Sequence, residues 1–251
     1  MFLSADIFEL LATFTIGIVC SFIGSIAGSG GLISIPFLML IGLPPLNAIA
    51  TNKFGAVGLS IGAMINFWRK KKINWHYVLP FSVIAIAGGV IGAKLLLEIN
   101  EALLRRIIAI IMLGMLPLLL MKREVGIESR RVSPRLKVLG YFLYFLCMIF
   151  GGFFGGGGVT IVFYMLIFCF GFTVLEANAT NIIPWFFVSL SSAVVYLVNG
   201  VVDIALGISL FLGMLIGAYI GSRVAIRRGD GWVKTFFTIV VVAASIKLLF
   251  D

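Results

Sequence analysis

The stretch GSIAGSGG, residues 24–31, interrupts an apolar run and has a counterpart in the second half of the chain, GGFFGGGG at residues 151–158. A second motif, Ala-Thr-Asn at residues 50–52, returns at residues 179–181. Two copies of one unit explain this pattern, and the unit is too long for a solenoid repeat. In a membrane protein, matched glycine-interrupted apolar segments in two halves point to a transport site at the interface between the halves.

Composition places this chain in a lipid bilayer. Of its 251 residues, 61% are hydrophobic and 12% are charged, and the mean hydropathy is +1.18. A water-soluble domain cannot hide so much apolar surface. Asp6 and Glu9 precede the first apolar run, which is therefore interpreted as a membrane helix and not as a cleaved signal peptide. We expect an all-α integral membrane protein with no appended soluble domain.

The apolar segments divide into five per half. We predict a first transmembrane repeat at residues 1–121, a basic cytoplasmic linker at 122–136 and a second transmembrane repeat at 137–251. The expected helical segments are 7–27, 32–43, 48–68, 76–97 and 103–121, then 137–154, 159–171, 177–198, 203–223 and 232–250. The second segment of each half follows a glycine-rich break and is too short to span about 30 Å of hydrocarbon alone.

Three basic connections, at residues 69–72, 122–137 and 223–234, hold most of the 19 Lys and Arg residues. The positive-inside rule assigns such connections to the cytoplasm. If the short segments re-enter, each half crosses four times and the repeats are parallel. If they cross, each half crosses five times and the repeats are inverted, which puts all three basic connections on one side. The charges favour the inverted arrangement, and the total is 8 to 10 crossings.

Glycine-rich breaks inside a membrane expose backbone N–H groups, which are tolerated only against protein or a water-filled cavity. The helices that begin near Leu32 and Val159 would point partial positive charge at these breaks, an arrangement that attracts an anion. The alternative is that the glycines only permit close helix packing, as in GxxxG motifs. The predicted substrate-binding residues are Gly28, Ser29, Gly30, Gly31, Thr51, Asn52, Lys53, Gly155, Gly156, Gly157, Gly158, Thr180 and Asn181.

Two of these groups have a competing structural interpretation. The Ala-Thr-Asn motifs are expected to begin the helices that follow them, so Thr and Asn could serve only as helix N-caps. Lys53 has Ile182 as its counterpart in the other half. A cation a few residues into an apolar helix is costly, so Lys53 either attracts an anion or extends to the membrane interface as an anchor.

Nothing in the sequence indicates an enzyme. The P-loop, HExxH and GxSxG patterns are absent, and there is a single histidine. The three cysteines have no metal-ligand spacing. We therefore expect no cofactor and no metal, and the basic connections need no nucleic-acid partner to explain them.

Two sets of residues form a recognisable pattern: in the first half the string Ser25–Leu32 with Pro36, Gly42, Pro45, Ala48 and Ala50–Lys53, and in the second half Gly155–Gly158 and Ala179–Asn181. Taken together, they resemble the TauE/SafE family of sulfite exporter-like permeases over essentially the whole chain. Ser29 departs from the family's pattern, in which glycine is usual, and its hydroxyl can donate to an anion.

This resemblance implies a multi-pass transporter of the plasma (cell inner) membrane that moves sulfite, sulfonates or related small sulfur anions. We expect a secondary transporter or exporter that works by alternating access at the repeat interface. A passive anion channel and a non-transporting membrane scaffold are the alternatives. The expected partners are a small anionic substrate and the lipid bilayer, and self-association into a homo-oligomer stays open.

Overall fold

The computed structural model describes residues 6–28, 30–69, 73–104, 106, 107, 110, 132–156 and 158–250. It is all-helical in this part of the chain, which confirms the predicted class. Its helices are α1 (Ile7–Ala27), α2 (Gly31–Leu40), α3 (Pro45–Arg69), α4 (Trp75–Leu97), α6 (Pro134–Phe153), α7 (Gly158–Met165) with the π-helix η1 (Leu166–Phe170), α8 (Val174–Val198) and α9 (Ile204–Phe250).

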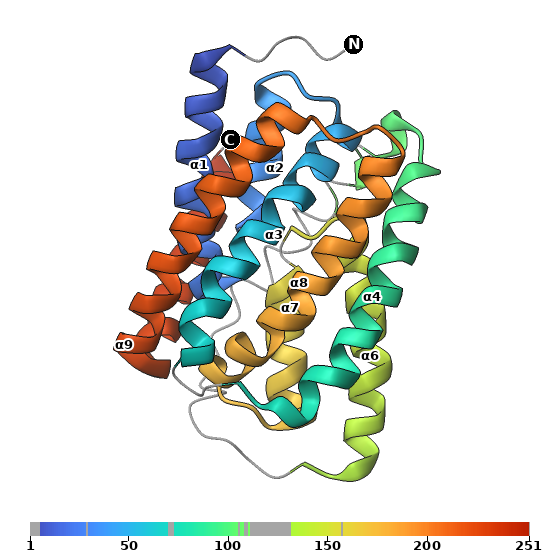
Figure 1. The fold of residues 1–251 in the computed structure, drawn as a ribbon. Coiled ribbons are helices and arrows are strands. Elements are labelled where there is room, and N and C mark those ends of the chain that lie inside the picture. Colours follow the sequence, from blue (N-terminus) through green and yellow to red (C-terminus); the bar gives the residue numbers. More distant parts are fainter. Residues whose placement is uncertain are drawn as a thin grey trace.

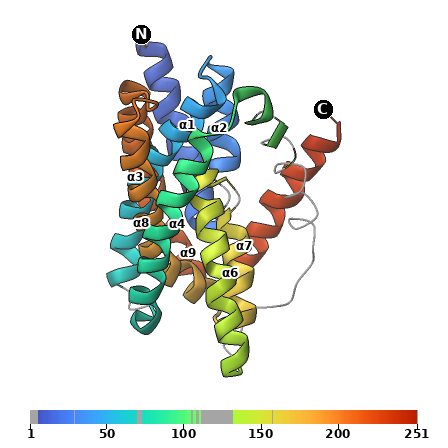
Figure 2. The same ribbon diagram turned by 90° about the vertical axis from the view of Figure 1, so that its right-hand side faces the viewer.

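Six of the described helices are long and apolar enough to cross a membrane: α1, α3, α4, α6, α8 and the part of α9 before Gly229. The chain is therefore a multi-pass membrane protein. Two shorter apolar helices, Gly31–Leu40 and Ile161–Phe170, accompany them. Most of the predicted segment 103–121 lies outside the described residues. Gly229 (φ 77°) interrupts α9, and Figure 2 shows that the helix changes direction there.

The six long helices form two antiparallel sets of three. In Figure 1, α1, α3 and the first part of α9 run in one direction, and α4, α6 and α8 run in the opposite one. Hydrogen bonds between helices support the shared direction of α1, α3 and α9. The Ser209 hydroxyl of α9 donates to the backbone oxygen of Leu10 in α1, and the Asn66 amide of α3 donates to the backbone oxygen of Tyr219 in α9. The bundle is thus held together largely by parallel neighbours that are distant in sequence.

Glycine pairs allow these parallel neighbours to approach closely. A Cβ on Gly88 would lie 2.6 Å from the Cβ of Met148 in α6. A Cβ on Gly217 would meet the backbone oxygen of Ile18 and the Ser21 hydroxyl of α1. Gly88 and Gly92 of α4, and Gly217 and Gly221 of α9, are GxxxG pairs that therefore form helix-packing surfaces, as small residues commonly do in membranes.

Both short helices double back. The four residues after α2 lead straight into α3, and the starts of α1 and α3 lie at the same end of the bundle (Figure 1). α2 therefore begins inside the bundle and returns the chain to the end at which α1 began. α7 and η1 do the same in the second half, between α6 and α8. Neither short helix spans a membrane by itself. Each nevertheless returns the chain to the end at which the preceding long helix began, so the chain direction is that of the crossing alternative and not of the re-entrant one.

Described cations of all three basic connections lie at one end of the bundle, where α3 ends, α6 begins and the first part of α9 ends (Figure 1). They are Arg69, Arg135, Lys137, Arg223, Arg227 and Arg228. The opposite end holds the starts of α1 and α9 and the end of α4, with Asp6, Glu9, Lys94, Glu98 and Asp203.

The expectation that the Ala-Thr-Asn motifs begin their helices, which allowed an N-cap role, is wrong. α3 begins at Pro45, a residue suited to the first helical position. α8 begins at Val174, and the Thr173 hydroxyl accepts a hydrogen bond from the Glu176 N–H as its cap. Each motif therefore lies in the second turn of its helix, deeper in the bundle than predicted.

Candidate functional site

The two glycine-rich breaks meet in the middle of the bundle. Gly28 and Gly155, at matching positions, both have left-handed backbone angles, with φ of 75° and 78°, which glycine adopts without a steric penalty. A Cβ on Gly31 would lie 2.9 Å from the Cα of Gly156. A Cβ on Gly28 would lie 2.8 Å from a methyl carbon of Val159. Only glycines permit this approach of the two halves.

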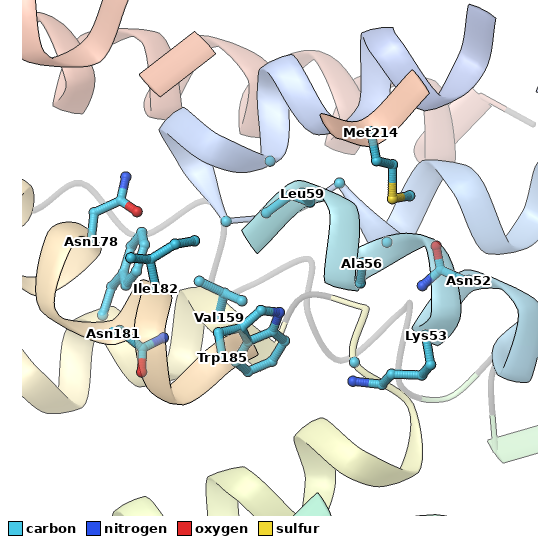
Figure 3. A pocket seen from close by; sticks show the side chains of 16 residues that line it. Asn52, Lys53, Ala56, Leu59, Val159, Asn178, Asn181, Ile182, Trp185 and Met214 are labelled. Carbon is cyan, nitrogen blue, oxygen red and sulfur yellow. The ribbon is translucent and has the colours of Figure 1, made fainter. Parts of the chain in front are cut away.

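A small cavity adjoins this junction (Figure 3). The volume in which a water molecule can be centred is about 40 Å³. One water needs roughly 10–15 Å³. This space suits a few waters or one small ion. Its lining residues are Gly24, Gly28, Gly30, Gly31, Asn52, Lys53, Ala56, Leu59, Gly155, Val159, Phe163, Asn178, Asn181, Ile182, Trp185 and Met214.

Lys53 is a buried lysine in the cavity wall. Its side chain is 1% exposed, so it does not reach the membrane interface as an anchor would. Its ammonium nitrogen lies 5.0 Å from the centre of the Trp185 ring, and a Cβ on Gly155 would be only 2.5 Å from that nitrogen. Among the described residues no carboxylate or other hydrogen-bond acceptor pairs with it. An uncompensated buried charge costs several kcal/mol. The charged form of Lys53 is therefore expected to need an anion beside it.

Asn52 and Asn181 present amide nitrogens to the cavity from opposite sides (Figure 3). The Ser34 hydroxyl donates to Asn52 Oδ1 at 2.5 Å, and the Tyr144 hydroxyl donates to Asn181 Oδ1 at 2.7 Å. Both lengths are typical of O–H···O bonds. With each carbonyl oxygen occupied, the NH2 group of each asparagine remains as a hydrogen-bond donor for a ligand.

Asn178 has the opposite orientation. Its Nδ2 donates to the backbone oxygen of Ser25 at 2.7 Å, and a carbonyl oxygen can only accept, so this bond fixes which way the amide points. Oδ1 of Asn178 is then the atom available to the cavity. The bond also ties α8 to the end of α1, next to the first glycine-rich break.

Thr51 and Thr180 do not line the cavity; they join helices. The Thr51 hydroxyl accepts from the backbone N–H of Asp203, 3.0 Å away, just before α9. The Thr180 hydroxyl accepts from the backbone N–H of Asn74, also 3.0 Å away, just before α4. Each threonine thus satisfies a backbone donor at the start of a helix in the other half of the chain.

The predicted residues therefore separate into four groups, of which the two threonines that join helices are one. Gly28, Gly30, Gly31, Asn52, Lys53, Gly155 and Asn181 line the cavity. Gly156 and Gly158 lie beside it, Gly156 against Gly31 and Gly158 against Phe150 and Trp185. Ser29 and Gly157 lie outside the described residues.

Sequence reasoning missed several residues of this site. Asn178 and Trp185 lie three residues before and four after Asn181, so helical spacing puts all three on one face of α8. That spacing could have identified them. Ser34 and Tyr144, which orient the two asparagines, are isolated hydroxyls that carry no such signal. Among the described residues, no group of three His, Cys, Asp or Glu side chains could hold a metal ion.

The described residues form six long apolar helices with a small cavity between them that is lined by Lys53 and three asparagines, an arrangement that defines a multi-pass membrane protein. Comparison with known proteins identifies the family. Residues 13–248 match the family described as "Sulfite exporter TauE/SafE". The chain belongs to this family.

Curated relatives cover nearly the whole chain. It is 28% identical to the "Probable membrane transporter protein" of Haemophilus influenzae over 97% of this chain and 96% of that one. It is 33% identical to the "Probable membrane transporter protein ORF9" of a Sinorhizobium species, over 97% and 94%. It is 31% identical to the "Probable membrane transporter protein YfcA" of Escherichia coli K12, over 95% and 88%. No solved structure matches the chain.

Proposed function

We propose that this protein is a secondary transporter that moves a small anion by alternating access, with the binding site at the junction of the two glycine-rich breaks. The single observation that carries the proposal is Lys53, a buried lysine at a cavity where no carboxylate of the described residues pairs with it. Polar and charged groups inside membrane proteins are rare and usually mark substrate or ion pathways.

Three other groups at the cavity suit an anion as well, namely two asparagine amides and one helix N-terminus. Asn52 and Asn181 direct NH2 donors at it. α2 begins at Gly31, which lines the cavity, so the partial positive charge of this helix N-terminus is directed there. Sulfite is the substrate that the family's description names, and we extend the proposal to sulfonates as related oxidised sulfur anions.

The two halves are proposed to be inverted repeats, with residues 1–121 and 137–251 joined by the linker. Three observations support this. The mates α1 and α6, α3 and α8, and α4 and α9 run in opposite directions (Figure 1). The contacts are reciprocal, since Thr51 binds the start of α9 and Thr180 binds the start of α4. The described cations of the basic connections lie at one end, as cytoplasmic loops require.

Export needs no ATP in this account. An inside-negative membrane potential favours outward movement of an anion by roughly 2.3 kcal/mol per charge and 100 mV. The basic end of the bundle would face the cytoplasm, in the cell inner membrane. Rocking of one repeat against the other around the junction would open the cavity to each side in turn.

The test is flux of sulfite and methanesulfonate from proteoliposomes that contain the full chain. The double variant Asn52→Leu with Asn181→Leu removes both amide donors and is expected to lower flux at least tenfold, since each hydrogen bond to a charged group contributes about 1.5–3 kcal/mol. Asn66→Leu is the matched control, because Asn66 is a buried asparagine of α3 that bonds to α9 and does not line the cavity. Equal flux in wild type and the double variant would refute the site.

A further inference from the structure

We propose that the cavity selects anions that carry a single negative charge, and that Lys53 is the residue that sets this selectivity. The proposal rests on the proposed anion site and adds the charge of the substrate to it. Lys53 is the only charged side chain among the described residues that line the cavity.

Charge neutrality is the physical basis of the selection. With the cavity empty, a protonated Lys53 is an uncompensated charge in a site of low dielectric constant. A bound monoanion brings the net charge of the site to zero. A dianion changes it from plus one to minus one, so an uncompensated charge of the opposite sign remains, and the energetic penalty of burying it remains as well.

The neighbours of Lys53 supply hydrogen bonds and no second cation. Asn52 and Asn181 offer neutral NH2 donors, and the Trp185 ring lies 5.0 Å from the Lys53 ammonium. Ala56, Leu59 and Val159 add apolar wall. Such a wall places no second positive charge beside a second negative one, and its apolar side chains replace none of the hydration that a dianion loses on entry.

The chain contains a natural place to change the charge of the cavity. Ile182 occupies the position in the second half that corresponds to Lys53 in the first. It also lines the cavity and is 5% exposed. A lysine at this position would give the cavity two cations, and exchanging the two residues would return it to one cation on the opposite wall.

The experiment uses three probes of similar shape that differ in charge: dimethyl sulfone (zero), methanesulfonate (minus one) and sulfate (minus two). Binding to the purified full chain in lipid nanodiscs is measured by calorimetry at constant ionic strength. Wild type is expected to bind methanesulfonate at least about tenfold more tightly than sulfate or dimethyl sulfone. Lys53→Met is expected to weaken methanesulfonate binding roughly 10- to 100-fold, the range for loss of a hydrogen bond to a charged group.

The charge-shifted variants make the test specific. Ile182→Lys is expected to reverse the preference and bind sulfate more tightly than methanesulfonate. Lys53→Ile combined with Ile182→Lys is expected to restore the preference for methanesulfonate. Thermal unfolding and size-exclusion profiles confirm that each variant is folded. Lys53→Met removes an unpaired buried charge and is expected to fold at least as stably as wild type, so it remains decisive if the other variants do not fold.

Two contrary results have different meanings. If wild type binds methanesulfonate and sulfate equally, or if Lys53→Met keeps the preference, selection of a single charge is refuted while the anion site stands. If neither anion binds and the three probes behave alike, the proposed anion site itself is refuted, and this inference with it.

Discussion

Replacement of Gly31 by alanine tests whether the glycine-rich breaks form a ligand site or serve helix packing alone. The added Cβ would lie 2.9 Å from the Cα of Gly156, whereas ordinary contacts begin at 3.4 Å. The two breaks must therefore move apart by about 0.5 Å. We expect this overpacking to destabilise the protein by about 1–3 kcal/mol. We also expect anion flux to fall about tenfold, because a displacement of 1 Å in a functional site can cost about a hundredfold.

Gly88→Ala is the matched control for this variant. Its Cβ would lie 2.6 Å from the Cβ of Met148 and 2.8 Å from the carbonyl carbon of the same residue. The overlap is larger than at Gly31, but Gly88 packs α4 against α6 and does not line the cavity. We expect a loss of stability at least as large, with flux per folded molecule close to wild type.

The assay combines thermal unfolding in detergent with flux of methanesulfonate from proteoliposomes, normalised to folded protein. The account predicts that stability falls in both variants and that normalised flux falls only in Gly31→Ala. If both variants lose stability and neither loses normalised flux, the glycines at the breaks serve packing alone.

Two further predictions concern the bonds around the cavity. Thr51→Val leaves the Asp203 N–H without its acceptor and is expected to destabilise the protein by about 1–3 kcal/mol. Thr180→Val leaves the Asn74 N–H without its acceptor and is expected to have the same effect. Unchanged unfolding temperatures would show that these hydrogen bonds do not hold the helices together. Tyr144→Phe frees Oδ1 of Asn181 and is expected to raise the Kd for methanesulfonate severalfold, as calorimetry would show; an unchanged Kd would mean that Asn181 needs no positioning.

Hydropathy and charge predicted the helices well, because a bilayer demands long apolar segments and tolerates few interruptions. The predicted segment 76–97 corresponds to α4, Trp75–Leu97, and 7–27 corresponds to α1, Ile7–Ala27. The starts of α3 and α8 were misplaced by about one turn, since Pro45 and Thr173 are start signals that hydropathy does not register.

The cavity was less accessible to sequence reasoning. Repetition of the glycine-rich strings indicated that two breaks exist, and the departure of Lys53 from the repeat singled it out. The distance between Lys53 and Trp185 depends on how α3 and α8 pack, and no spacing within either helix contains that information. The same holds for Thr51 and Thr180, whose partners are about 100 to 150 residues away in the sequence.

The most direct test of the central claim is an experimental structure of the full chain with bound methanesulfonate. The account predicts density for the anion where the two breaks meet, within hydrogen-bond distance of Lys53 Nζ and of the Asn52 and Asn181 amides. An empty cavity, with the anion bound only elsewhere on the protein, would contradict it.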